Sequence, residues 1–134
     1  MRPDPIPGKA LDAWQQALGQ LLKEADACAR LQVAPETLHR QVRRREMIAL
    51  PLRDGQAVYP AWQFDTEVEQ RHVPARAHVH LARTGQVSAW TAASWLVTPH
   101  PELDGASPVA FVRAGGDAAK LLTVAQRDAA RLAE

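Results

Sequence analysis

Residues 24–60 read EADACARLQVAPETLHRQVRRREMIALPLRDGQAVYP and carry the strongest structural signals in the chain. Their first half predicts two short helices, over residues 23–31 and 35–45, joined by a turn of three residues. The second helix begins with a proline, whose φ angle is already helical and whose missing N–H would have no partner there. Leu38 and Val42, four residues apart, form its inward face. Two short helices joined in this way are typical of a helix-turn-helix.

A β-hairpin is predicted directly after these helices. Apolar residues at 47–52 and 57–60 flank the four residues RDGQ. Asp-Gly between two apolar segments is a strong hairpin signal, because both central positions of the tight turn need a positive φ. Pro51 has no N–H to donate, so we expect the first strand to lie at the sheet edge. The whole stretch therefore predicts a winged helix-turn-helix, in which this hairpin is the wing.

A further helix is predicted to begin at Lys9. Its apolar face consists of residues three or four apart, namely Leu11, Trp14, Leu18, Leu21 and Ala25. Gly19 lies inside this run and weakens it. The part formed by Leu11, Trp14 and Leu18 is interpreted either as a dimer surface or as core, and the spacing fits both. Residues 1–8 hold three prolines and are predicted to be a flexible arm.

The second half of the chain predicts a small helical bundle. Apolar and polar residues do not alternate as in a strand within residues 61–69, 75–83 and 88–97, and we predict a helix in each of these segments. Ser107 and Pro108 start a helix, as N-cap and first helical residue, and Gly115-Gly116 ends it. Asp117 caps a last helix whose apolar stripe is Ala118, Leu121, Leu122, Ala125, Ala129 and Leu132. The predicted fold class is mainly α with one small β-hairpin.

Length and composition limit the function classes. The chain has 134 residues, of which 46% are hydrophobic, enough for one compact domain or two lobes sharing a core. We assign the winged helix-turn-helix to residues 9–62 and a helical domain to 63–134. The first residues do not resemble a signal peptide, and no run of about 18 apolar residues exists, so we expect a cytoplasmic protein without a membrane span.

The sequence contains no pattern of residues that is typical of a catalytic or metal-binding site. Cys28 is the single cysteine, which excludes an internal disulfide and a cysteine zinc cage. His78 and His80 are two residues apart, so on a helix they point about 200° away from each other. No phosphate-binding, dinucleotide or nucleophile-elbow pattern occurs. We therefore expect no enzyme, no metal and no cofactor.

Positive charge is concentrated in the predicted helix-turn-helix. The formal net charge of the chain is +1, whereas residues 36–53 hold five arginines and two glutamates, a net charge of +3. An arginine run at a helix end is also favoured by the helix dipole alone. Together with the turn and the wing it favours DNA binding, since arginine grips phosphates and guanine edges. The candidate DNA-binding residues are Thr37, His39, Arg40, Arg43, Arg44 and Arg53.

Residues 24–44 resemble the DNA-binding modules of excisionase-like and MerR-like proteins. Those families usually have glycine at the position of Gln32 and a serine or threonine cap at the position of Ala34. A missing cap costs about 1 kcal/mol of helix stability. The resemblance supports the module, and these two departures concern the geometry of its turn.

Residues 93–111, ASWLVTPHPELDGASPVAF, resemble the toxin-binding domain shared by MbcA, ParS and Xre-type antitoxins. That family has a Trp-Leu pair, a Pro-x-Pro turn, a Leu-Gly-Gly loop and a helix opened by Ser/Thr-Pro. Asp104 replaces the first glycine of the loop. The resemblance covers about residues 60–134. For Trp95, Leu96 and Leu103 we favour a role in the core over direct contact with a partner.

The resemblance implies a function and a partner. Such antitoxins neutralise a RES-type toxin, which acts on NAD, and bind the promoter of their own operon. Carried over to this chain, the toxin contacts would be Pro101, Arg127, Arg131 and Glu134. We expect a homodimer on double-stranded DNA, because one short recognition helix reads few bases. The alternatives are a DNA-binding transcription factor without a toxin and a protein-interaction module that has lost DNA binding.

Overall fold

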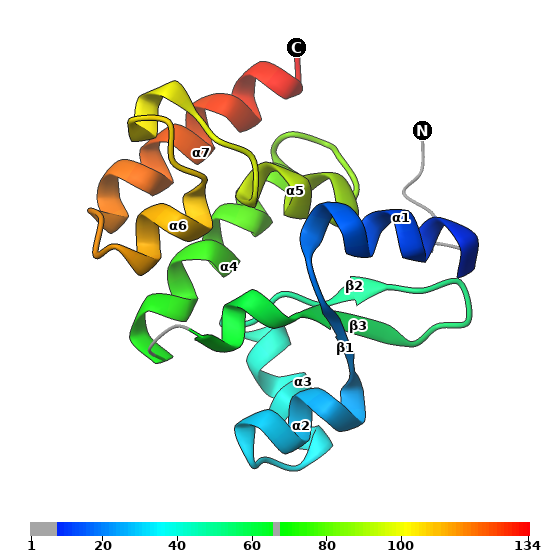
Figure 1. The fold of residues 1–134 in the computed structure, drawn as a ribbon. Coiled ribbons are helices and arrows are strands. Elements are labelled where there is room, and N and C mark those ends of the chain that lie inside the picture. Colours follow the sequence, from blue (N-terminus) through cyan, green and yellow to red (C-terminus); the bar gives the residue numbers. More distant parts are fainter. Residues whose placement is uncertain (1–7, 66–67) are drawn as a thin grey trace.

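Seven α-helices and three short strands make up the part that the computed structural model describes, residues 8–65 and 68–134 (Figure 1). The predicted mainly-α fold is confirmed. In chain order the elements are α1 Gly8–Leu18, β1 Leu21–Lys23, α2 Glu24–Leu31, α3 Pro35–Arg43, β2 Leu50–Pro51, β3 Ala57–Pro60, the 3-10 helix η1 Ala61–Asp65, α4 Val68–Arg83, α5 Ala89–Leu96, the 3-10 helix η2 Pro101–Leu103, α6 Pro108–Arg113 and α7 Ala118–Leu132.

The two helices of the predicted helix-turn-helix, α2 and α3, are joined by the predicted turn. Gln32 ends α2 in the left-handed conformation (φ 57°), which favours glycine over other residues. Ala34 precedes α3 without a side-chain cap, and Pro35 is the first helical residue. The second helix was predicted to reach about Arg45 but ends at Arg43. Arg45 has φ 61°, which turns the backbone away from the helix.

The predicted hairpin is present, and it belongs to a three-stranded antiparallel sheet with the order β1-β3-β2. Strand β2, with Pro51, lies at an edge as expected. The prediction of one helical face from Leu11 through Ala25 was wrong, because α1 ends at Leu18 and Leu21 pairs with Pro60 in the sheet. Gly19, with φ 84°, makes the change of direction that other residues rarely allow.

Helix α1 packs on the core, which supports the core interpretation of its apolar face. Leu18 is buried, and Leu11 and Trp14 are partly buried against the same cluster. The rings of Trp14 and Trp90 lie 5.4 Å apart. Gly8 already belongs to α1, and the rest of the predicted flexible arm, residues 1–7, lies outside the described residues.

The core crosses the boundary that we assigned between residues 62 and 63. Its largest cluster joins Leu18, Ile48 and Leu50 to Trp90 and Leu96. The indole Nε1–H of Trp90 donates to the carbonyl of Pro51 at 2.9 Å. The wing therefore rests on α5, and the two predicted units share one core.

The helical half follows most of the predicted boundaries. Ser107 caps α6 and Asp117 caps α7 through their side chains. Segments 61–69 and 75–83 were predicted separately, whereas α4 runs without a break through Pro74. In the apolar stripe of α7, the buried residues are Leu121, Ala125 and Ala129, while Leu132 is 50% exposed. Helices α4 and α7 pack against each other, as Figure 1 shows.

His78 on α4 makes stability depend on pH. Its side chain is buried and its Nε2–H donates to the carbonyl of Ala89 at 2.8 Å. Burial lowers the pKa of His78 below its usual 6.5, and the hydrogen bond to Ala89 only partly offsets this. The folded state thus binds fewer protons than the unfolded state, so stability falls as the pH drops below about 6.5.

We expect the free energy of unfolding to decrease between pH 7.5 and 5.5, with a slope of up to about 1.4 kcal/mol per pH unit from this residue. Urea unfolding of the wild type and of His78→Gln measures the difference. Gln keeps a donor for Ala89 but does not titrate, so its slope should be smaller. Equal slopes in both proteins would contradict the assignment to His78.

Candidate nucleic-acid interface

Helix α3 presents a basic face because its apolar face is anchored. Leu38 is fully buried among Ala27, Met47 and Tyr59, and this contact sets the rotation of the helix. The residues left exposed are Glu36, His39, Arg40, Arg43 and Arg44, while Thr37 is half-buried. Of the candidates on this helix, all except Thr37 therefore lie fully on the outer side, as the spacing predicted.

Arg53 lies on the turn of the wing, between β2 and β3. The turn is closed by the Leu52 N–H, which donates to the Gln56 carbonyl at 2.8 Å, and by the Asp54 carboxylate, which accepts from the Gln56 N–H at 2.9 Å. Gly55 has φ 87°. Arg53 is exposed at this turn, and it does not line the groove described next.

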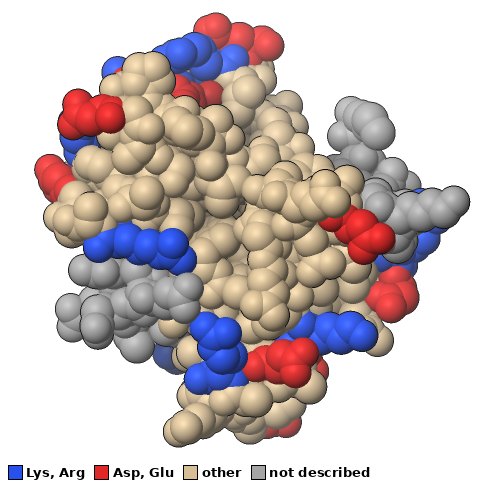
Figure 2. Space-filling model, viewed as in Figure 1, with Lys and Arg blue, Asp and Glu red and all other residues tan. Residues whose placement is uncertain are grey.

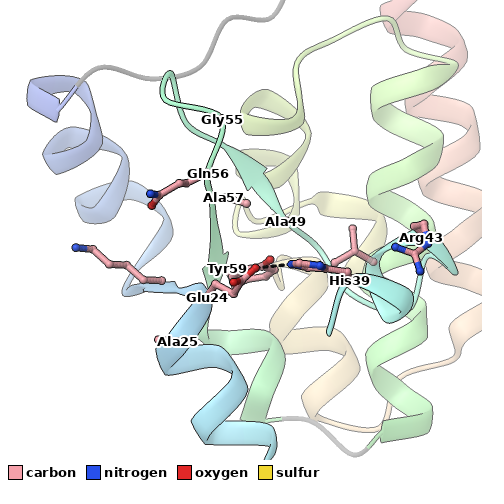
Figure 3. Close-up of a pocket in the computed structure, with 11 residues that line it drawn as sticks. Glu24, Ala25, His39, Arg43, Ala49, Gly55, Gln56, Ala57 and Tyr59 are labelled. Carbon is pink, nitrogen blue, oxygen red and sulfur yellow. Dashed lines mark hydrogen bonds and ion pairs between the residues drawn. The ribbon is translucent and has the colours of Figure 1, made fainter. Parts of the chain in front are cut away.

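A groove of about 720 Å³ separates α3 from the wing (Figure 3). Its lining comes from the junction of β1 and α2, from the outer side of α3 and from the hairpin. The charged and polar residues in this lining are Lys23, Glu24, His39, Arg43, Gln56 and Tyr59. Of the predicted candidates, the groove thus brings together His39 and Arg43. Arg40, Arg44 and Thr37 lie outside it.

His39 and Glu24 form an ion pair across this groove when His39 is protonated (Figure 3). The two side chains are about half exposed and come from α3 and from the first turn of α2. Sequence reasoning missed Glu24 and Lys23, because they lie fifteen or more residues from His39 and Arg43, the candidates that line the groove. Glu24 is visible in the sequence only as an acid at a helix start, which the helix dipole explains by itself.

The face of the molecule shown in Figure 2 carries dispersed charge. On the face shown in Figure 2, the middle is largely uncharged, and Lys and Arg side chains lie beside Asp and Glu along the rim. The described residues form no continuous basic patch on this face. Attraction to a polyanion would thus depend on local clusters, in agreement with the net charge of +1.

The candidates for toxin contact lie at the other end of the chain. Arg127 pairs with Glu102 at 3.2 Å, which brings it next to the turn that contains Pro101. Arg131 pairs with Asp128 on its own helix at 3.4 Å. All four candidates, including Pro101 and Glu134, are exposed. Leu96 and Leu103 are buried, and Trp95 is partly buried and donates its indole N–H to Asp128, as expected for core residues.

Within residues 8–65 and 68–134, no cluster of three His, Cys, Asp or Glu side chains is arranged to hold a metal ion. The helices of this part are too short or too polar to span a membrane. The chain matches no family model, no curated protein and no solved structure.

Proposed function

We propose that this chain is a DNA-binding antitoxin-like autorepressor, whose α3 enters the major groove of its own promoter. The observation that carries the proposal is the exposed arginine face of α3, with Arg40, Arg43 and Arg44 directed outward by the buried Leu38. A second helix in this position is the element that reads bases in helix-turn-helix proteins. Arginine forms bidentate contacts with guanine and with phosphate.

The groove beside α3 supports the same function. A duplex that holds α3 in its major groove has one of its sugar–phosphate strands alongside the helix. The groove of the protein lies between α3 and the wing, on the side where such a strand would run. Lys23 and Arg43 line it and offer positive charge to phosphates. Arg53, at the turn of the wing, extends the positive surface to the next part of the backbone.

Fluorescence anisotropy with the chain's own upstream DNA and with a scrambled duplex, across a salt series, tests the proposal. We expect binding that is tighter to the native sequence and that weakens steeply with salt, because phosphate contacts release counterions. Equal, weak binding to both duplexes would refute sequence-specific recognition and leave the protein-interaction module as the better hypothesis.

The antitoxin part of the proposal places a RES-type toxin on the C-terminal region. It is supported by the sequence pattern of residues 93–111 and by the exposure of Arg127, Arg131 and Glu134. Leu132, half exposed, borders an apolar groove of about 220 Å³ that also includes Trp95 and Val87. Co-purification with a RES-domain protein encoded next to the gene tests this part. Without such a gene, a stand-alone transcription factor is the remaining DNA-binding alternative.

Replacing Glu24 with glutamine should tighten DNA binding about threefold to tenfold. The change removes a negative charge that faces the incoming phosphates, and it releases His39 from its ion pair. Anisotropy at constant salt measures the effect. Asp26→Asn is the matched control, because Asp26 is an exposed acid in the same helical turn. Weaker binding by Glu24→Gln would show that Glu24 holds His39 in its productive position.

A further inference from the structure

A second basic cluster lies where the end of α3 meets α4. Arg44, Arg45, Arg76 and His80, together with Val79, line a pocket of about 330 Å³, called here the Arg76 pocket. Arg44 and Arg45 follow α3, and Arg76 and His80 belong to α4, about thirty residues later in the chain. The fold therefore gathers three guanidinium groups and an imidazole around one hollow.

The backbone at the end of α3 and the rotation of α4 explain why these side chains meet. Arg44 closes the last turn of α3 through its N–H, which bonds to the Arg40 carbonyl at 2.9 Å, and Arg45 leaves the helix with φ 61°. On α4, Arg76 and His80 are one turn apart and share a face. Ala75 and Ala77 are buried, so the core sets the rotation of α4 and Arg76 is exposed.

The Arg76 pocket has no neutralising carboxylate among the residues that the structure describes. Its lining holds none, and neither Arg44, Arg45 nor Arg76 is in an ion pair with a described acid. Like charges brought together in one hollow repel one another, and an anion with several oxygens relieves that repulsion. Guanidinium groups match a phosphate in geometry as well as in charge.

We propose that the Arg76 pocket binds a phosphate of the DNA backbone, on the duplex that α3 reads. The inference rests on the proposed function. Arg44 belongs to both surfaces, four residues after Arg40, so the exposed face of α3 continues into the pocket. A contact of this kind positions the protein on the duplex without reading bases. Helix α4 thus becomes part of the nucleic-acid interface, outside the helix-turn-helix.

Arg76→Ala tests the proposal by anisotropy against native and scrambled DNA over a salt series. We expect affinity to fall about fivefold to tenfold for both duplexes alike, and the salt slope to decrease by about one. Arg76→Lys, which keeps the charge, should retain most of the affinity. Arg83→Ala is the matched control, because it removes an exposed arginine from α4 that does not line the pocket. Circular dichroism verifies that each variant is folded.

The outcomes separate the two proposals. If the wild type binds its DNA and Arg76→Ala equals the Arg83→Ala control, the pocket proposal is overturned and the proposed function stands. If the wild type binds no DNA, the proposed function fails. The pocket is then tested alone by titration with inorganic phosphate at constant ionic strength, with the NMR signals of His80 as the readout. A saturable shift of the His80 signals that Arg76→Ala abolishes would support a phosphate site in the Arg76 pocket. The absence of a shift would overturn that site.

Discussion

Arg40→Ala combined with Arg43→Ala is expected to lower the affinity for native DNA by about 100-fold or more. Each arginine that grips a base edge or a phosphate contributes about 1–3 kcal/mol, and two such losses reach that factor. Both side chains are exposed on α3, and alanine is the best helix former, so the fold should be unaffected. Anisotropy gives the affinity, and thermal unfolding followed by circular dichroism gives the stability.

The control for this double variant is Arg83→Ala combined with Arg127→Ala. It removes the same charge from exposed positions on α4 and α7. We expect a change of less than about fivefold, since long-range attraction alone depends weakly on two distant charges at physiological salt. If both double variants bind equally well, α3 does not read DNA, and the interaction-module hypothesis takes precedence.

Trp90→Ala should reduce the free energy of unfolding by about 3–5 kcal/mol, the range for aromatic truncation in a core. Trp90 is 1% exposed, packs on Trp14, and donates its indole N–H to the Pro51 carbonyl. The substitution leaves a cavity between α1, α5 and the wing, and it removes the partner of a carbonyl. Urea unfolding monitored by circular dichroism measures the loss.

Trp90→Phe separates packing from hydrogen bonding, because phenylalanine keeps an aromatic ring and lacks the N–H donor. Its expected cost is about 1–3 kcal/mol, smaller than that of alanine. Both variants should unfold in one transition, since the cluster around Trp90 joins α1 and the wing to the helical half. Two separate transitions, or a loss below about 1 kcal/mol for Trp90→Ala, would contradict a shared core.

The elements that were predicted correctly have signals carried by neighbouring residues. Pro35 starts α3, Ser107 and Asp117 cap α6 and α7, and Asp54-Gly55 forms the hairpin turn. Each signal acts through a φ preference or a hydrogen bond within three residues, so it does not depend on the rest of the fold. The arginine face of α3 was predictable for the same reason, because helical spacing alone places Arg40 and Arg43 opposite Leu38.

Strand β1 and the path of α4 were not predictable in this way. Leu21 forms a strand because β3, almost forty residues later, offers it backbone partners, and two leucines followed by a lysine are equally compatible with a helix. Helix α4 runs through Pro74 although an isolated helix loses a backbone hydrogen bond there. Packing against α5 and α7 compensates for that cost, and only the assembled core provides it.

The candidate site, too, was predictable from the sequence only in part. Local sequence predicted which residues of α3 face outward, except for Thr37, which is half-buried, and it placed Arg53 on the wing turn. The approach of Glu24 to His39, the shared core beneath the wing, and the meeting of Arg44 with Arg76 all join residues at least fifteen positions apart. Helical periodicity describes direction around one axis and contains no information about the distance between two axes. That distance is set by the packing of buried side chains such as Leu38 and Trp90.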